Sequence, residues 1–247
     1  MLANDGENSW DLRKSSICKL ISDQRPDIIG TQEGYFPQIE HLIANLPEYW
    51  CVATGRDDGV REGETCALFV LRSRFEVIDS GTFWFSETPD VPGSRHWTRH
   101  HPRICTWAKV HFIENPTETL TVYNVHLDHE SQLARENSCK MLSEHIDAAG
   151  SSALVMGDFN MEPDNSGYTI MTEGDQGLFD SCLAAAPESD RPGTFHNFTG
   201  QTDMESIDYI FVTKNLIVSD AKVLNQKVDN RYPSDHYPIT ATISTGT

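Results

Sequence analysis

Polar and apolar residues alternate most regularly between Thr119 and Leu127. One face of an extended chain would carry Leu120, Val122, Asn124 and His126, and the other Thr121, Tyr123, Val125 and Leu127. A repeat of two residues is typical of a β-strand, whose side chains point alternately to opposite faces. The pattern therefore predicts a strand that carries two polar residues, Asn124 and His126, toward its carboxyl end.

Other segments extend this picture along the chain. Apolar positions at helical spacing predict helices over residues 11–24, 36–46 and 130–149. Strand patterns cover residues 27–33, 49–54, 65–71, 75–84, 104–112, 153–156, 206–212 and 236–243. Many strands, few helices and hairpin-like spacing predict an α/β fold, a four-layer sandwich of two mixed β-sheets flanked by helices. No repeat or long linker divides the sequence, so residues 1–247 are expected to form a single domain.

Charge is the compositional feature that bears most on function. The chain has 19 Lys and Arg against 37 Asp and Glu, a net charge of −18. Long nucleic acids are bound largely through basic contacts to phosphate, so this acidity disfavours them as partners and favours a small substrate. The sequence has no run of about 20 apolar residues that could span a membrane, so no membrane partner is expected. Six scattered cysteines are typical of free thiols in a reducing compartment, which favours a cytoplasmic protein.

Four segments place polar side chains where an apolar strand ends. They are Thr31-Gln32-Glu33, Asn124-Val125-His126-Leu127-Asp128, Gly157-Asp158-Phe159-Asn160, and Ser234-Asp235-His236-Tyr237-Pro238 with Ile207-Asp208-Tyr209 before it. Strand ends are rigid but open to solvent, so they can hold catalytic groups in a fixed geometry. Each segment alone is also typical of an ordinary turn or polar pair. All four together predict an active site.

In this order and at this spacing, the segments resemble the endonuclease/exonuclease/phosphatase superfamily. The likeness runs from Asp5 to about Ile243. Further stretches are similar to a microbial branch with poorly defined substrates, namely Asp5–Trp10, Gly55–Gly59, Ser80–Trp84 and Pro102–Trp107. The resemblance implies a hydrolase that cuts a phosphate ester by in-line attack of a metal-activated water.

The resemblance also implies a metal site. Glu33 would hold Mg²⁺, or Mn²⁺ in its place, and Asp235 would assist from a later strand. Mg²⁺ prefers oxygen ligands, commonly one or two carboxylates together with water and phosphate oxygens. Asp158 would orient and deprotonate the attacking water, although the sequence alone leaves His236 as an alternative base.

Five residues gain roles in phosphate binding and charge stabilisation from the same resemblance. Asn160 and His126 would hydrogen-bond the phosphoryl oxygens, and Asn124 would contact phosphate or support a neighbour that does. His236 would stabilise charge on the phosphoryl group. Asp208 would accept a hydrogen bond from the His236 ring and favour the charged imidazolium. Phosphoryl transfer depends mainly on positioning and charge neutralisation, which such a set supplies.

One basic segment breaks the acidic trend. Arg95, His96, Arg99, His100, His101 and Arg103 fall within nine residues that contain no acid. In a substrate cleft, Arg99 and Arg103 would bind phosphate and Trp97 would stack on a sugar or base. Alternatively, the segment is a surface loop that pairs with nearby carboxylates. Arg103 favours the first interpretation most, since it stands at the start of a predicted strand.

The sequence thus predicts a divalent-metal-dependent phosphoesterase for a phosphomonoester or phosphodiester of modest size. A nuclease acting on DNA or RNA is the main alternative, which the basic segment favours and the net charge opposes. An inactive relative that only binds ligand is a third. The oligomeric state and the identity of the substrate are not predicted.

The first residues differ from the superfamily pattern. Members open with a β-strand that carries an Asn beside the metal-binding Glu. This chain opens at Met1, in the loop expected after that strand, and Asn4 and Asn8 are poor substitutes because both are loop residues before a helix. We therefore expect a longer form that begins one strand earlier, or else a shortened protein with weakened activity.

Overall fold

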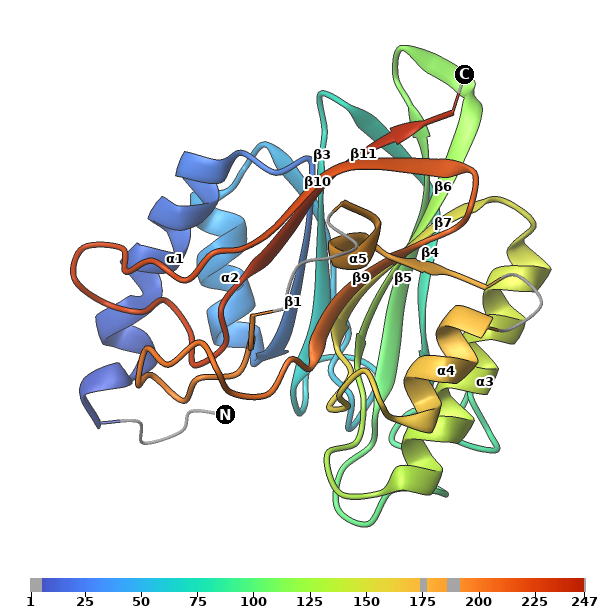
Figure 1. The fold of residues 1–247 in the computed structure, drawn as a ribbon, viewed down its shortest axis with the longest axis horizontal. Helices are drawn as coiled ribbons and strands as arrows, with labels where there is room; N and C mark the ends of the chain where they lie inside the picture. The colour runs from blue at the N-terminus through green and yellow to red at the C-terminus, as the bar shows by residue number, and fades with distance from the viewer. Residues whose placement is uncertain (1–5, 174–176, 186–191, 247) are drawn as a thin grey trace.

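Two β-layers pack face to face, and helices cover both outer sides (Figure 1). The computed structural model describes residues 6–173, 177–185 and 192–246. This arrangement confirms the predicted α/β sandwich with flanking helices. Residues 1–5, on which the expectation of a missing first strand bears, lie outside the described ranges, so that expectation stays a prediction.

The larger layer is a six-stranded mixed sheet in the order β4-β5-β6-β7-β9-β8. Its strands are β4 (Phe75–Trp84), β5 (Ile104–Phe112), β6 (Asn115–His126), β7 (Ser152–Asp158), β8 (Phe179–Asp180) and β9 (Asp208–Val212). β6 and β7 are parallel because helix α3 (Gln132–Ala149) carries the chain back between them, and the other neighbours are antiparallel. Three central strands, β6, β7 and β9, thus lie side by side.

The smaller layer consists of two antiparallel sheets. One has the order β1-β3-β2, with β1 (Ile28–Gly34), β2 (Tyr49–Val52) and β3 (Thr65–Leu71). The other pairs β10 (Leu216–Val223) with β11 (Ile239–Thr245). The sequence predicted one mixed sheet here. Neighbouring strands in the described residues all run in opposite directions, so this layer has no parallel pair.

Alternation along β6 fixes what each of its faces packs against. Leu120 and Val122 belong to the core between the two β-layers, with Val70 of β3 and Ile239 of β11. Tyr123 and Val125 belong to the opposite core, which α3 and α4 (Ser166–Glu173) cover. A third core joins β3 to α1 (Trp10–Gln24) and α2 (Phe36–Asn45). The two faces predicted from the sequence are therefore confirmed.

Four elements were not predicted from the sequence. They are α4, β8, α5 (Ser181–Ala185) and β10, besides the short 3-10 helix η1 (Gly6–Asn8). Except for β10, these are too short to give a clear periodic pattern. In β10 the register shifts between Val218 and Asp220, which interrupts the alternation that would mark a strand. Among the described residues, no helix is both long and apolar enough to cross a membrane.

Candidate active site

Three strand ends meet at one edge of the six-stranded sheet. β6 ends at His126, β7 ends at Asp158 and β9 begins at Asp208. In the sheet register, His126 stands opposite Asp158, and Asp158 stands opposite Asp208. All three side chains are buried, with exposed fractions of the residues between 5% and 8%. Strand pairing therefore aligns three predicted site residues that lie far apart in the sequence.

His236 completes this cluster from the segment before β11. Its Nδ1 lies 2.8 Å from Oδ2 of Asp208, at hydrogen-bond distance. One ligand atom from each of Asp158, Asp208 and His236 lies within 4.8 Å of the others. The ring of Phe195 packs against the His236 ring at a centroid distance of 5.1 Å. His236 is thus held by an ion pair on one side and an aromatic ring on another.

Thr194 connects the two members of this ion pair. Its hydroxyl oxygen accepts hydrogen bonds from the backbone N–H groups of Ile207 (3.0 Å) and Asp208 (3.1 Å). Its carbonyl oxygen accepts one from the N–H of Tyr237, which follows His236 (2.7 Å). Thr194 is fully buried. One residue therefore fixes the backbone beside both the carboxylate and the imidazole.

Burial and mutual charge set the protonation states of the cluster. Burial alone lowers the pKa of His236, but the Asp208 carboxylate more than offsets it and raises the value to about 10. Burial, together with the negative charge of Asp208, raises the pKa of Asp158 to about 8. The cluster thus combines a histidine that is charged at neutral pH with a carboxyl group that binds a proton far more readily than usual.

His126 lies between Asp158 and Glu33. Its Nε2 is 3.5 Å from Oδ2 of Asp158 and 3.8 Å from Oε1 of Glu33. Burial lowers its pKa far below the usual range, and the nearby charges of Arg103 and Arg56 add to that shift. His126 is therefore a neutral imidazole, able to hydrogen-bond a phosphoryl oxygen without carrying a charge.

The two predicted metal ligands lie outside the buried cluster. The Glu33 side chain is 57% exposed, and Asp235 is half-buried beside His236. Desolvation by the surrounding protein raises the pKa of Glu33, as do the carboxylates of Glu64 and Asp235. This concentration of acidic groups is the kind of donor set that a hard divalent cation fits.

The backbone departs from ordinary geometry at two site residues. Glu33 and Asn160 have φ values of 61° and 49°, in the left-handed region that residues other than glycine rarely adopt. Such strain is held only where surrounding structure imposes it, and it gathers at functional sites. Gly157 allows a close approach of β7 to β6, since a Cβ there would lie 2.0 Å from the carbonyl oxygen of Val125. A glycine is therefore required beside Asp158.

The two asparagines predicted to belong to the site differ in their surroundings. Asn124 is fully buried, donates to the carbonyl oxygens of Thr31 and Ala67, and accepts a hydrogen bond from Gln32. These bonds tie β6 to the smaller layer, so the structure favours a supporting role over phosphate contact. Asn160 is only partly buried and donates its side-chain N–H to the carbonyl oxygen of Leu127. Its position after Asp158 leaves it next to the cluster.

The basic segment divides at Pro102. Arg103 is 4% exposed, lies 3.6 Å from Asp128 and bonds to Nδ1 of His129 at 2.9 Å. Arg99 is exposed, and Trp97 packs partly against the core under α3. The structure thus brings Arg103 to the site edge and places Arg99 and Trp97 in the loop beyond it.

Sequence reasoning missed three buried residues beside the site. They are Thr194, Arg56 and Glu64. Arg56 lies in the family-like stretch Gly55–Gly59 and pairs with Glu64 at 2.5 Å, so that stretch carried a signal that could have found it. Thr194 gave no comparable signal, because its role depends on backbone groups that are distant along the chain.

Comparison with solved structures places this geometry among known proteins. An endonuclease/exonuclease/phosphatase from Bacteroides vulgatus has a TM-score of 0.92 and 34% identity, covering 98% of this chain and 93% of its own. A mannosyl-6-phosphatase of Bacteroides thetaiotaomicron has a TM-score of 0.88 and 31% identity, covering 96% and 92%. Both likenesses therefore extend over nearly the full length of the two chains compared.

Comparisons of the amino-acid sequence with known proteins agree with the structural comparison. Nocturnin of Rattus norvegicus is 26% identical over an alignment of 253 positions, which covers 93% of this chain but 56% of nocturnin. The chain thus spans little more than half the length of that curated relative. The model of the endonuclease/exonuclease/phosphatase family matches residues 3–236. The chain belongs to this family, whose members are hydrolases that act on phosphoesters.

Proposed function

We propose that the protein is a divalent-metal-dependent phosphoesterase that hydrolyses a phosphomonoester or phosphodiester of modest size by in-line attack of water. One observation carries the proposal. The buried Asp158–Asp208–His236 cluster combines a proton-binding carboxyl group with a charged imidazole, next to His126 and Glu33. Phosphoryl transfer needs this kind of positioned charge more than it needs a covalent intermediate.

Proton transfer follows from the two raised pKa values. His236 keeps its proton at neutral pH because of Asp208, so it stabilises negative charge on the phosphoryl oxygens and cannot act as the base. Asp158, with a pKa of about 8, loses its proton at lower pH than His236 does, so its deprotonated form is the group that accepts the proton of the attacking water. The structure supports this choice over His236, the alternative that the sequence left open.

The proposed metal site uses the two acids that lie outside the buried cluster. Glu33 and Asp235 would hold Mg²⁺ or Mn²⁺, and a cation there would offset the repulsion that raises the pKa of Glu33. When bound, such an ion neutralises phosphate charge and makes water more acidic. His126 and Asn160 would orient the phosphoryl oxygens from the buried side of the site.

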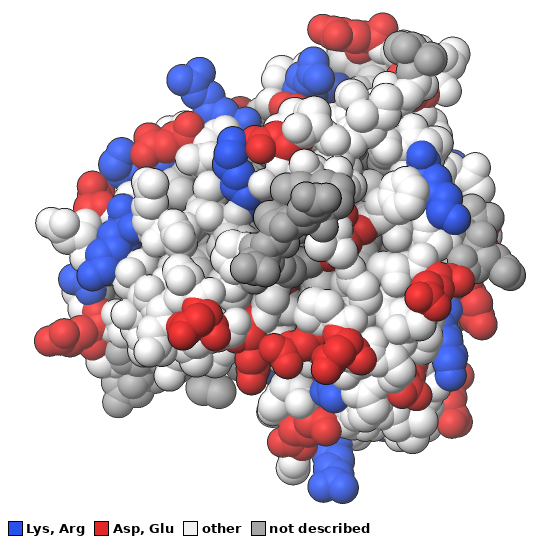
Figure 2. Space-filling view, in the orientation of Figure 1, with Lys and Arg blue, Asp and Glu red and all other residues white. Residues whose placement is uncertain are grey.

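Two observations support a small substrate. The net charge of −18 opposes binding of long polyanions, and a row of acidic side chains crosses the lower middle of the face in Figure 2. The similar protein from Bacteroides thetaiotaomicron is a mannosyl-6-phosphatase. A sugar phosphate or another compact phosphoester fits both observations.

A nuclease is the second candidate. It draws support from the family, which includes endonucleases and exonucleases, and from the exposed Arg95 and Arg99 of the basic segment. Its difficulty is the net charge of −18, which opposes the binding of long nucleic acids.

The test is a panel of sugar phosphates, aryl phosphates, phosphodiesters, RNA and plasmid DNA, each with Mg²⁺, with Mn²⁺ and with excess EDTA. We expect turnover of small phosphoesters that EDTA abolishes and that Asp158→Asn loses. Full activity in EDTA would refute the metal dependence. Faster degradation of plasmid or RNA than of every small substrate would favour the nuclease. Ligand binding without any turnover would favour an inactive relative.

A further inference from the structure

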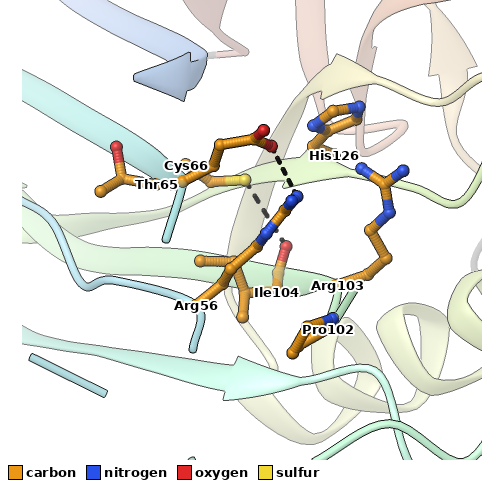
Figure 3. Close-up of a pocket in the computed structure, with 8 residues that line it drawn as sticks. Arg56, Thr65, Cys66, Pro102, Arg103, Ile104 and His126 are labelled. Carbon is orange, nitrogen blue, oxygen red and sulfur yellow. Dashed lines mark hydrogen bonds and ion pairs between the residues drawn. The ribbon is translucent and has the colours of Figure 1, made fainter. Parts of the chain in front are cut away.

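A small cavity opens between the two β-layers behind His126. Arg56 reaches it from the loop after β2, Cys66 from β3, and Arg103 from the residue before β5. Figure 3 shows Arg56 and Arg103 extending side by side toward His126. The cavity has a volume of about 10 Å³, close to the room that a single water or a single oxygen atom of a ligand needs.

The cavity is lined by more hydrogen-bond donors than its acceptors satisfy. Arg56 and Arg103 are 5% and 4% exposed. Nε of Arg56 and both Nε and Nη1 of Arg103 are buried without a hydrogen-bond partner. Arg56 does pair with Glu64, and Nε of Arg103 lies 3.6 Å from Asp128. Buried polar atoms are nearly always paired in folded proteins, so these point to an acceptor from outside the chain.

The cavity adjoins the reacting group. His126 forms part of the cavity wall, and Nε2 of its ring lies 3.5 Å from Asp158 and 3.8 Å from Glu33. An acceptor that meets the two arginines therefore lies one imidazole ring away from the carboxylates assigned to catalysis.

We propose that Arg56 and Arg103 form an oxyanion pocket for a third non-bridging phosphate oxygen and thereby select phosphomonoesters over phosphodiesters. The proposal rests on the proposed function and names its substrate class. A phosphomonoester has three non-bridging oxygens and close to two negative charges above pH 7, whereas a diester has two such oxygens and one charge. Arginine suits this task because its planar fork binds phosphate oxygens through charge-assisted bonds.

The test uses two substrates with the same leaving group, p-nitrophenyl phosphate and methyl p-nitrophenyl phosphate, at about pH 8, where the monoester is a dianion. We expect the wild-type protein to prefer the monoester in kcat/KM. Arg103→Gln and Arg56→Gln should each lower kcat/KM for the monoester about 10- to 100-fold, the effect of losing a charge-assisted bond, and change the diester much less. The preference for the monoester over the diester should therefore be lost.

Controls separate recognition from loss of structure. Arg74→Gln removes an exposed arginine of the β3–β4 turn and should leave both rates unchanged. Arg103→Lys keeps the charge without the fork, so it should fold if Arg103→Gln does not, and it should lose part of the preference. Equal losses on both substrates would overturn the proposal, as would a wild-type preference for the diester. An ordered water as the only occupant predicts such equal losses.

A binding measurement judges the pocket independently of catalysis. Inorganic phosphate should raise the Tm of the wild-type protein and of Arg74→Gln, and this shift should be lost in Arg103→Gln and Arg56→Gln. If no phosphoester is hydrolysed but the shift depends on the two arginines, the proposed function fails and the pocket stands. The same phosphate shift in all variants would refute the pocket.

Discussion

The strand-borne cluster of His126, Asp158, Asp208 and His236 and the basic loop 95–101 carry most of the chemistry predicted for this chain, yet they are built differently. Its three residues on strands, His126, Asp158 and Asp208, are buried where sheet register fixes their neighbours, and His236 is held against them by Asp208. The loop is largely exposed and tied mostly to itself, through Arg95 to the carbonyl oxygen of His100 and through Thr98 to that of His101. The cluster therefore has a set geometry, and the loop does not.

The difference shows where a nearby charge is strong enough to set the protonation state of a histidine. In the cluster, the Asp208 carboxylate, aided by Asp158 and Asp235, raises the pKa of His236 to about 10 because these groups are largely removed from water. In the loop, His100 lies 3.5 Å from Glu130 with both side chains well exposed, a pairing that water and salt weaken. We therefore expect substitutions in the cluster to change kcat strongly and those in the loop to change KM weakly.

The largest effect should come from the cluster itself. Asp158→Asn removes the proposed base, and His236→Ala removes the charged imidazole. Each should lower kcat by on the order of 10²-fold or more with the fold intact. Steady-state kinetics with circular dichroism measure this, and His111→Gln, which changes a histidine on β5 outside the site, is the matched control. Retention of more than a tenth of wild-type kcat would remove the residue from the mechanism.

The pH profile should follow the two raised pKa values. The base acts when Asp158 is unprotonated, so kcat/KM should rise with pH up to a limb at or below about 8. His236 acts when protonated, so activity should fall as pH passes through about 10. Asp208→Asn removes the carboxylate that raises the pKa of His236, and the upper limb should therefore move to lower pH. An upper limb that stays in place would show that another group controls it.

Thr194→Val tests how far the hydrogen bonds between Thr194 and the backbone determine the geometry of the cluster. The valine has a similar shape but cannot accept the two N–H bonds from Ile207 and Asp208. The two unpaired donors should cost about 1 to 3 kcal/mol in the free energy of unfolding. We expect kcat to fall about 10-fold with little change in KM, and Thr194→Ser to restore it. If stability falls while the kinetics and the pH profile stay unchanged, Thr194 supports the fold alone.

How well each part of the structure could be predicted from the sequence depends on which interactions determine its position. The strand alternation from Thr119 to Leu127 predicted both faces of β6 because the two-residue periodicity of a strand is directly linked to burial. The strand-end acids could be located for the same reason. Thr194 could not, since its partners are backbone groups thirteen and fourteen residues away. Arg99 stands near Arg103 in sequence, but Pro102 separates a loop residue from a buried one.

The smallest effect should come from the basic loop. Arg99 is exposed, so its attraction for a phosphate is screened by water, and Arg99→Glu should raise the apparent KM about two- to fivefold, as expected for an interaction of less than about 1 kcal/mol. Salt should erase the effect, because the Debye length falls to about 3 Å at 1 M ionic strength. Arg103→Glu should raise the apparent KM far more at either salt concentration, since Arg103 is buried.

The measurement is KM at low and high salt for both variants and for Trp97→Ala, which tests the predicted stacking. A loss for Arg99→Glu that persists in high salt and matches that of Arg103→Glu would place the loop in direct contact with substrate. The contrast between a fixed cluster and a weakly acting loop would then be wrong.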